Sequence, residues 1–95
     1  MHYTYVLVSE RDRGSYTGCT VNLRARFAAH NQGRVPATAA RRPFRLLYYE
    51  ACLRAEDAYR REKYLKTGRR KRYLRHRLRA TLFALWPSKL ERAER

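Results

Sequence analysis

Hydrophobic and polar positions alternate along the first half of the chain in a way that predicts three strands. Residues 3–9 and 15–20 are rich in aromatic and β-branched side chains, as strands are, and the polar segment between them ends in Gly14. A loop of this length typically joins antiparallel strands, so we expect a hairpin. Residues 44–50 have the same character and predict a third strand.

Between the second and third predicted strands the pattern changes to that of one helix and one loop. The helix is expected to begin at about Leu23, capped by Asn22 or Thr20, and to end at the stop signal Asn-Gln-Gly in residues 31–33. Residues 34–43 are small, basic and bracketed by prolines, without helical or strand periodicity. We expect this segment to be a loop that faces the substrate.

Two more helices are predicted after the third strand. Residues 55–67 begin with acidic side chains and are followed by Gly68, which suits a helix dipole and its end. From residue 69 a helix is expected to run to Trp86-Pro87, with a wall of Arg and Lys on one side and an apolar side made by Leu74, Leu78, Leu82 and Leu85. We expect the apolar side to close the core; the alternative is that it docks a partner or a second copy.

The element order ββαβαα predicts an α+β (α/β) fold in which a small three-stranded antiparallel sheet is flanked by helices. A chain of 95 residues has room for one core. We expect residues 1–80 to form the functional domain and residues 81–95 to be the end of the last helix and a charged tail. Cys19 and Cys52 lack metal-site spacing and are expected to be ordinary reduced thiols.

The strong positive net charge of the chain indicates a negatively charged partner. The chain carries 23 Lys and Arg against 8 Asp and Glu, a formal net charge of +15. Neutralising phosphates releases counterions, so such a surface favours nucleic acid. The sequence has neither an apolar stretch long enough for a membrane span nor a signal-peptide pattern. We therefore expect a cytoplasmic protein that binds DNA, possibly RNA, and no membrane.

A few side chains have positions that suggest chemistry. Tyr5 and Tyr16 can lie side by side on the hairpin, although strand tyrosines are more often structural. Arg26 and His30 are four residues apart and project from one side of a helix at the sheet edge; a solvated helix face is the alternative. Glu62 lies on the apolar stripe of its helix, where a carboxylate needs either a salt bridge to a neighbouring Arg or a metal ion.

Short motifs in this order cover roughly residues 1–80. They are Tyr3-Thr4-Tyr5, Tyr16-Thr17-Gly18, the helix entry at 18–27, His30-Asn31 before a glycine, and the segments 42–50 and 58–66. Their order and spacing resemble the GIY-YIG endonuclease family, in particular its small standalone bacterial members of the YhbQ type. The first two motifs stand where the family has Gly-Ile-Tyr and Tyr-Ile-Gly, and the first keeps only its tyrosine.

The resemblance implies an endonuclease that hydrolyses DNA phosphodiester bonds with one divalent ion, Mg²⁺ or Mn²⁺, and is structure-specific and linked to DNA repair or processing. The catalytic residues it implies are Tyr5, Tyr16, Arg26, His30 and Glu62, with Glu62 as the metal ligand. A tyrosine base needs nearby positive charge to lower the pKa of its phenol, and Arg26 and the metal are the candidates. His30 can instead accept the proton, directly or from the tyrosine.

Basic residues outside this set are expected to contact the nucleic-acid backbone. They are Arg34, Arg41, Arg42, Lys66, Arg69, Arg70, Lys71 and Arg72. The main alternative is a module of the same fold that binds DNA, RNA or the ribosome without cutting. The expected assembly is a monomer or a weak homodimer.

Overall fold

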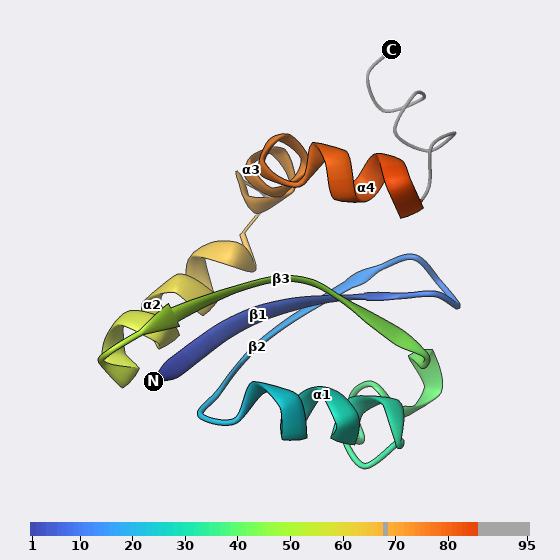
Figure 1. Ribbon diagram of the computed structural model, residues 1–95, viewed down its shortest axis with the longest axis horizontal. Coiled ribbons are helices and arrows are strands. Elements are labelled where there is room, and N and C mark those ends of the chain that lie inside the picture. Colours follow the sequence, from blue (N-terminus) through green and yellow to red (C-terminus); the bar gives the residue numbers. More distant parts are fainter. Residues whose placement is uncertain (68, 86–95) are drawn as a thin grey trace.

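Three strands form one antiparallel sheet in the order β2-β1-β3. The computed structural model describes residues 1–67 and 69–85 (Figure 1). The strands are β1 (His2–Ser9), β2 (Ser15–Thr20) and β3 (Phe44–Cys52). The hairpin and the three-stranded antiparallel sheet are as expected, except that β3 runs on to Cys52 instead of ending at Glu50.

Helices flank the sheet, as the fold prediction requires. They are α1 (Leu23–Asn31), a short 3₁₀ helix η1 (Ala39–Arg41), α2 (Ala55–Leu65), α3 (Arg69–Arg77) and α4 (Arg79–Leu85). The first helix has the expected N-cap, in which the Asn22 side chain accepts from the Ala25 N–H. Among the helices of the described residues, none combines the length and the apolar content needed to cross a membrane.

Two expectations about the helices were wrong. The long helix from residue 69 is two helices that meet at Leu78 (Figure 1). Its apolar spacing did not distinguish the two arrangements, because Leu82 N still donates to Leu78 O at the junction, at 2.9 Å. The basic loop is not wholly irregular, since Thr38 N donates to Val35 O in a turn and Arg41 N donates to Thr38 O in η1, which follows it.

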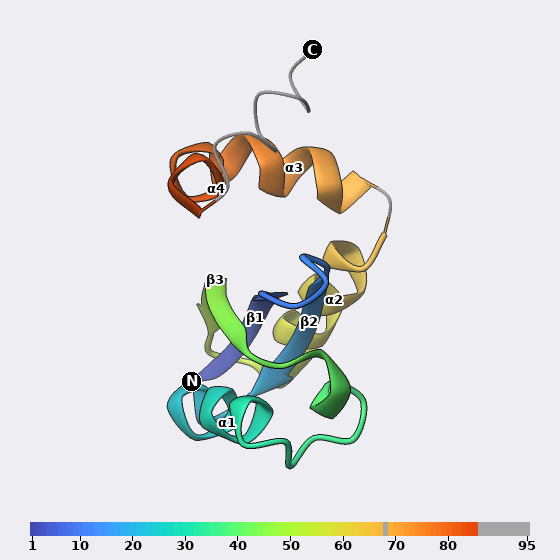
Figure 2. The ribbon, with the colours of Figure 1, turned by 90° about the vertical axis from the view of Figure 1, so that its right-hand side faces the viewer.

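The sheet has a hydrophobic cluster on each face. On one face Tyr5, Leu7 and Phe44 are buried, with side chains of α1 packed against them. On the other, Val6 packs with Leu65 of α2 and Leu74 of α3. Figure 2 shows α1 on one side of the strands and α3 and α4 on the other.

Part of the apolar side of the last helices closes the core as expected. Leu74 is buried and Leu78 packs against the same cluster, while Leu82 is half-buried. The described residues therefore give the docking alternative little support. The side chain of Leu85 and the whole of Trp86 lie outside the described part, as does the predicted charged tail at residues 88–95.

A half-buried polar network joins β3 to α2 and α3. The Arg61 guanidinium donates to Glu50 Oε1 at 2.8 Å and to Oε2 at 3.0 Å. Its centre lies 4.9 Å from the Tyr64 ring and 4.8 Å from the Tyr73 ring. Tyr48 donates to the same carboxylate, and burial together with that bond raises the pKa of Tyr48 to about 12. The network ties the basic helix α3 to the sheet.

Replacing Arg61 with methionine is expected to lower the free energy of unfolding by about 1–3 kcal/mol, because the Glu50 carboxylate loses its charged donor in a half-buried setting. Arg60→Met is the matched control. The Arg60 ion pair with Asp57 is 3.8 Å long and its side chain is 81% exposed, so its loss is expected to cost less than about 0.5 kcal/mol. Urea denaturation of both variants measures the difference; equal losses would contradict the role given to the network.

Candidate active site

Tyr5 and Gly18 occupy opposed positions on β1 and β2, and their contact sets the shape of the site. Tyr5 pairs with Gly18 in the strand register, and Tyr16 pairs with Leu7. A Cβ atom at Gly18 would lie 2.6 Å from the Tyr5 hydroxyl oxygen. Gly18 is therefore needed because the Tyr5 phenol passes directly over its backbone.

Gly18→Ala is expected to displace the Tyr5 hydroxyl, to cost about 1–3 kcal/mol of stability through overpacking, and to reduce any reaction that uses that hydroxyl by about 10²-fold. Gly14→Ala is the matched control in the same hairpin. Its nearest clash, at 2.8 Å, is with the Nη2 tip of Arg41, which can move away. Urea midpoints of the two variants should differ clearly, and a Gly18→Ala protein as stable as wild type would refute the contact.

His30 lies completely buried between the two tyrosines. Its Nε2 is 2.9 Å from the Tyr5 hydroxyl, and its ring centroid is 5.0 Å from that of Tyr16. The expected place at the sheet edge and the solvated-face alternative are both wrong for His30. Helix α1 directs the His30 side chain onto the face of the sheet that α1 covers, where Phe44 also packs against the imidazole ring.

The contacts of Thr38 favour one tautomer of His30. The buried Thr38 hydroxyl lies 2.7 Å from His30 Nδ1 and 3.4 Å from Val35 O. Both contacts are hydrogen bonds when Nδ1–H donates to the hydroxyl and the hydroxyl donates to Val35 O. The lone pair on Nε2 then faces Tyr5, whose hydroxyl donates to it. Thr38 thus prepares His30 as a proton acceptor.

The C-terminal end of α1 is held by its own side chains. Asn31 donates to Phe44 O and accepts from Phe44 N–H, at 3.1 and 2.6 Å, so it clamps the helix to the start of β3. Gly33, with φ of +76°, then turns the chain towards the loop that carries Thr38. Asn31 and Gly33 therefore hold His30 and the Thr38 loop in position relative to the sheet.

Burial decides the protonation states of the central pair. Burial raises the pKa of Tyr5; the hydrogen bond and the charge of Arg26 lower it, and Tyr16 and Glu62 raise it further, with a net upward shift. Arg26 acts on the Tyr5 pKa in the expected downward direction, but burial outweighs it. Burial, and then the charge of Arg26, lower the pKa of His30, which leaves a neutral imidazole at physiological pH.

The lowered pKa of His30 makes stability depend on pH in a defined direction. Above the ordinary value of 6.5 the imidazole is neutral in both states. As the pH falls below 6.5, the unfolded chain takes up the proton first, so stability is lost until the pH passes the folded-state pKa. His30→Gln should flatten this part of the curve. Urea unfolding at about pH 7.5 and about pH 5 compares the two proteins, and equal slopes would contradict the assignment.

Arg26 provides a cation with unused hydrogen-bonding capacity. Its side chain is half-buried, and its Nε is a buried nitrogen without a hydrogen-bond partner among the described residues. A buried donor of this kind costs free energy until an acceptor arrives. Because its charge acts on both Tyr5 and His30, an anion bound there would lie beside the proton-accepting pair.

Glu62 faces the site from α2. Its side chain is 21% exposed and its Oε2 lies 3.0 Å from Lys66 Nζ. The salt bridge in the structure is therefore with Lys66 and not with an Arg. Its charge contributes to raising the pKa of Tyr5 and also that of Cys19, which burial raises most. Glu62 is thus close to the end of β2 and is not turned out to solvent.

Glu62 is a single carboxylate, which suits a metal ion that needs few protein ligands. Among residues 1–67 and 69–85, no three His, Cys, Asp or Glu side chains come together. One partly exposed carboxylate matches an ion that takes most of its ligands from water and phosphate, as Mg²⁺ does. The donor set therefore fits one Mg²⁺ or Mn²⁺ held by Glu62.

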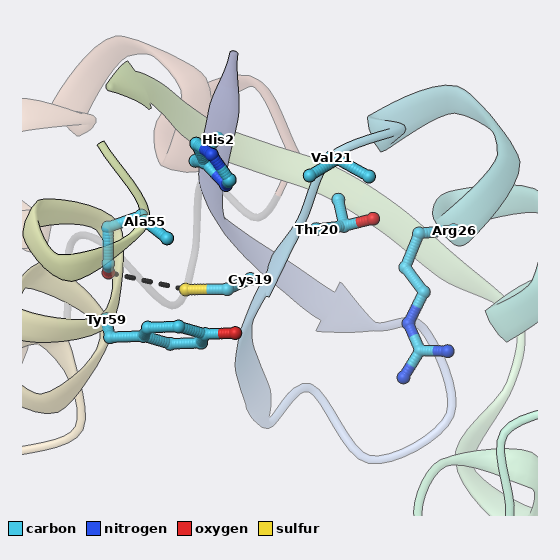
Figure 3. Close-up of a pocket in the computed structure, with 8 residues that line it drawn as sticks. His2, Cys19, Thr20, Val21, Arg26, Ala55 and Tyr59 are labelled. Carbon is cyan, nitrogen blue, oxygen red and sulfur yellow. Dashed lines mark hydrogen bonds between the residues drawn. The ribbon is translucent and has the colours of Figure 1, made fainter. Parts of the chain in front are cut away.

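A cleft of about 370 Å³ adjoins these residues between α1 and α2. Cys19 and Thr20 of β2 line it together with Arg26 and, from α2, Ala58 and Tyr59. Figure 3 shows Tyr59 extending from α2 towards β2, with Arg26 coming from α1 on the other side of Thr20 in this view. The dashed contact is the Cys19 thiol donating to Ala58 O, at 3.3 Å.

The basic residues expected to contact nucleic acid divide into exposed and paired ones. Arg34, Arg42 and Arg72 are exposed. Arg41 is paired with Asp12, Nε to Oδ2 at 2.7 Å, a bond that lowers the pKa of Asp12 to about 2. Lys66 is paired with Glu62. Arg69, Arg70 and Lys71 begin α3, but their side chains lie outside the described part.

Two residues that the sequence did not single out as functional belong to the site. Thr38 orients His30 from the loop, and Cys19 lines the cleft beside Glu62. A polar residue flanked by alanines in an otherwise basic loop was the only sequence signal for Thr38. Cys19 gave none beyond its place one residue after Gly18.

Comparison with known proteins gives matches over most of the chain. Residues 1–75 match the GIY-YIG catalytic domain. A UPF0213 protein of Staphylococcus haemolyticus is 41% identical over 75 residues, which are 78% of this chain and 90% of that protein. One of Pediococcus acidilactici is 44% identical over 80 residues, 78% of each chain. A solution NMR structure of a UPF0213 protein from Bacillus halodurans is 36% identical, with a TM-score of 0.49 over 77% of this chain and 80% of that one.

Proposed function

The chain belongs to the GIY-YIG family, a nuclease family, and on that premise we propose that it is an endonuclease that hydrolyses DNA phosphodiester bonds. The observation that carries the proposal is the Tyr5 hydroxyl bonded to a buried, neutral His30 within reach of the charge of Arg26. A module that only binds DNA has no need of a proton acceptor buried and oriented in this way.

The tyrosine and histidine act as a proton relay. A water molecule that attacks phosphorus must lose a proton as its oxygen bonds. The raised pKa of Tyr5 means that the phenol is protonated at neutral pH. It can accept the water proton only while passing its own to His30 Nε2, whose lone pair faces it. The Tyr16 ring packs against the same imidazole, and its hydroxyl is the second candidate to contact the attacking water.

Arg26 holds the scissile phosphate. Arg26 lines the cleft and its charge already acts on Tyr5, so a fixed positive charge is in place when negative charge grows on the phosphoryl oxygens. The same charge favours transient negative charge on the Tyr5 oxygen. One guanidinium therefore assists both the attacking and the phosphoryl oxygens.

Glu62 is the proposed ligand of the divalent ion. When bound, Mg²⁺ or Mn²⁺ supplies Lewis-acid stabilisation of the phosphate and of the leaving oxygen. Glu62 would exchange its ion pair with Lys66 for the metal. Lys66 would then be free to contact a phosphate, the role expected for it from the sequence.

The path of the DNA is constrained by where the basic segments lie. The loop with Arg34 and Arg42 lies on the α1 side, and α3 with Arg72 lies on the opposite side of the sheet (Figures 1 and 2). A DNA strand that contacts both must pass one edge of the sheet, and the cleft lined by Arg26 and Cys19 lies at the β2 edge. We propose that the scissile phosphate lies at this edge and that the natural substrates are branched or flapped DNAs of repair or processing.

A panel assay tests the proposal. Linear, nicked, flap and junction DNAs, and one RNA, are incubated with and without Mg²⁺ or Mn²⁺. We expect metal-dependent nicking of the branched or flapped DNAs. No cutting of any substrate with either ion would favour the non-catalytic binding module instead.

A further inference from the structure

The cleft between α1 and α2 has features beyond those needed for hydrolysis, and we infer that it binds one unpaired nucleobase of the DNA strand next to the scissile phosphate, with Tyr59 as the stacking surface. This inference rests on the proposed function. It names a specificity-determining residue and a substrate class, DNA with an unpaired nucleotide at the cut.

The cleft has the size of a site for one small ligand. Its volume of about 370 Å³ lies within the range of roughly 300–1,000 Å³ that is usual for such sites. The small side chains Ala55 and Ala58 leave this space along α2. To lie in the cleft a base must leave the duplex stack, and this costs least for a base that is already unpaired.

Tyr59 is an exposed aromatic residue, and packing in the core does not account for an aromatic ring at this position. Its side chain is 61% exposed, whereas Ala58 beside it is 1% exposed. It makes no contribution to either hydrophobic cluster. In Figure 3 its ring reaches across the cleft towards β2. An exposed aromatic ring over a lined hollow is the arrangement that single-stranded nucleic acids use for base stacking.

The cleft adjoins the proposed phosphate site both on its α1 side and on its α2 side. Arg26, the residue proposed to hold the phosphate, is part of its lining. On the other wall, Glu62 follows Ala58 by four residues, which is one helical turn. A strand with its phosphate between Arg26 and Glu62 would therefore present a neighbouring base to the Tyr59 ring.

The test separates base binding from cleavage. A flap DNA is bound in EDTA at one fixed salt concentration, and an abasic nucleotide is placed in turn at each position around the flap junction. Wild type and Tyr59→Phe should lose about tenfold in affinity at one position, the size of one lost stacking contact. Tyr59→Ala should bind the intact flap about tenfold more weakly and be insensitive to the abasic position. Tyr49→Ala, a 53% exposed tyrosine on β3, is the matched control and should behave as wild type.

Equal binding of intact and abasic flaps by wild type, or full affinity of Tyr59→Ala, would overturn the inference. The same substrates are then cut in Mg²⁺ to locate the scissile bond, which should adjoin the sensitive position; a sensitive position elsewhere would also overturn it. If wild type shows the base effect but cuts nothing, the nuclease proposal fails and the base preference remains. If it cuts without a base effect, only the present inference fails.

Discussion

Replacing Arg26 by alanine is expected to slow DNA cleavage by about 10²- to 10³-fold while leaving DNA affinity almost unchanged. The rate falls because a preorganised donor aimed at developing charge contributes on this scale. Affinity changes little because Arg26 is one of 23 basic residues. Folding should suffer little, since the Nε has no partner to lose and the loss is confined to the hydrogen bond with Tyr5. Single-turnover cleavage and binding in EDTA measure the two effects separately.

Arg24→Ala is the matched control for Arg26→Ala. Arg24 lies on the same helix and is exposed, and its replacement removes the same unit of charge. The Arg24→Ala variant should cut flap DNA at nearly the wild-type rate. If both variants lose cleavage in proportion to a small loss of affinity, Arg26 is a backbone contact and the catalytic role assigned to it is wrong.

The sheet was predictable because its signals are local. Alternation of apolar residues, the glycine at the end of the hairpin loop and the Asn22 cap lie within a few residues of the elements they define. The division between α3 and α4 was not predictable, because both arrangements keep the same apolar spacing. The pairing of Arg41 with Asp12 joins two loops far apart in sequence, so its Arg was expected to face nucleic acid instead.

The candidate site was only partly predictable for the same reason. The pair Tyr5 and Tyr16 follows from strand alternation and register, which are local properties. The pKa of Tyr5 depends on burial by α1, and the orientation of His30 depends on Thr38, so neither could be read before the chain was folded. Sequence reasoning therefore identified the residue types and the direction in which Arg26 shifts the Tyr5 pKa, but not the burial that outweighs it.

Glu62→Gln is expected to remove metal-dependent cleavage, by at least about 10²-fold, because a divalent ion contributes several kcal/mol of charge stabilisation. Glutamine keeps the size of the side chain but is a poor ligand for a hard cation. Stability should change little, since the lost partner, Lys66, is 54% exposed and returns to solvent. Glu56→Gln, an exposed acid in the first turn of the same helix, is the matched control.

Titration of Mg²⁺ and Mn²⁺ against the cleavage rate of one flap DNA, for wild type, Glu62→Gln and Glu56→Gln, tests most directly whether these side chains form a single metal-dependent site. Wild type and Glu56→Gln should cut with the same dependence on metal and not at all in EDTA, and Glu62→Gln should remain almost inactive at every concentration. Cleavage by Glu62→Gln at the wild-type rate would contradict the account.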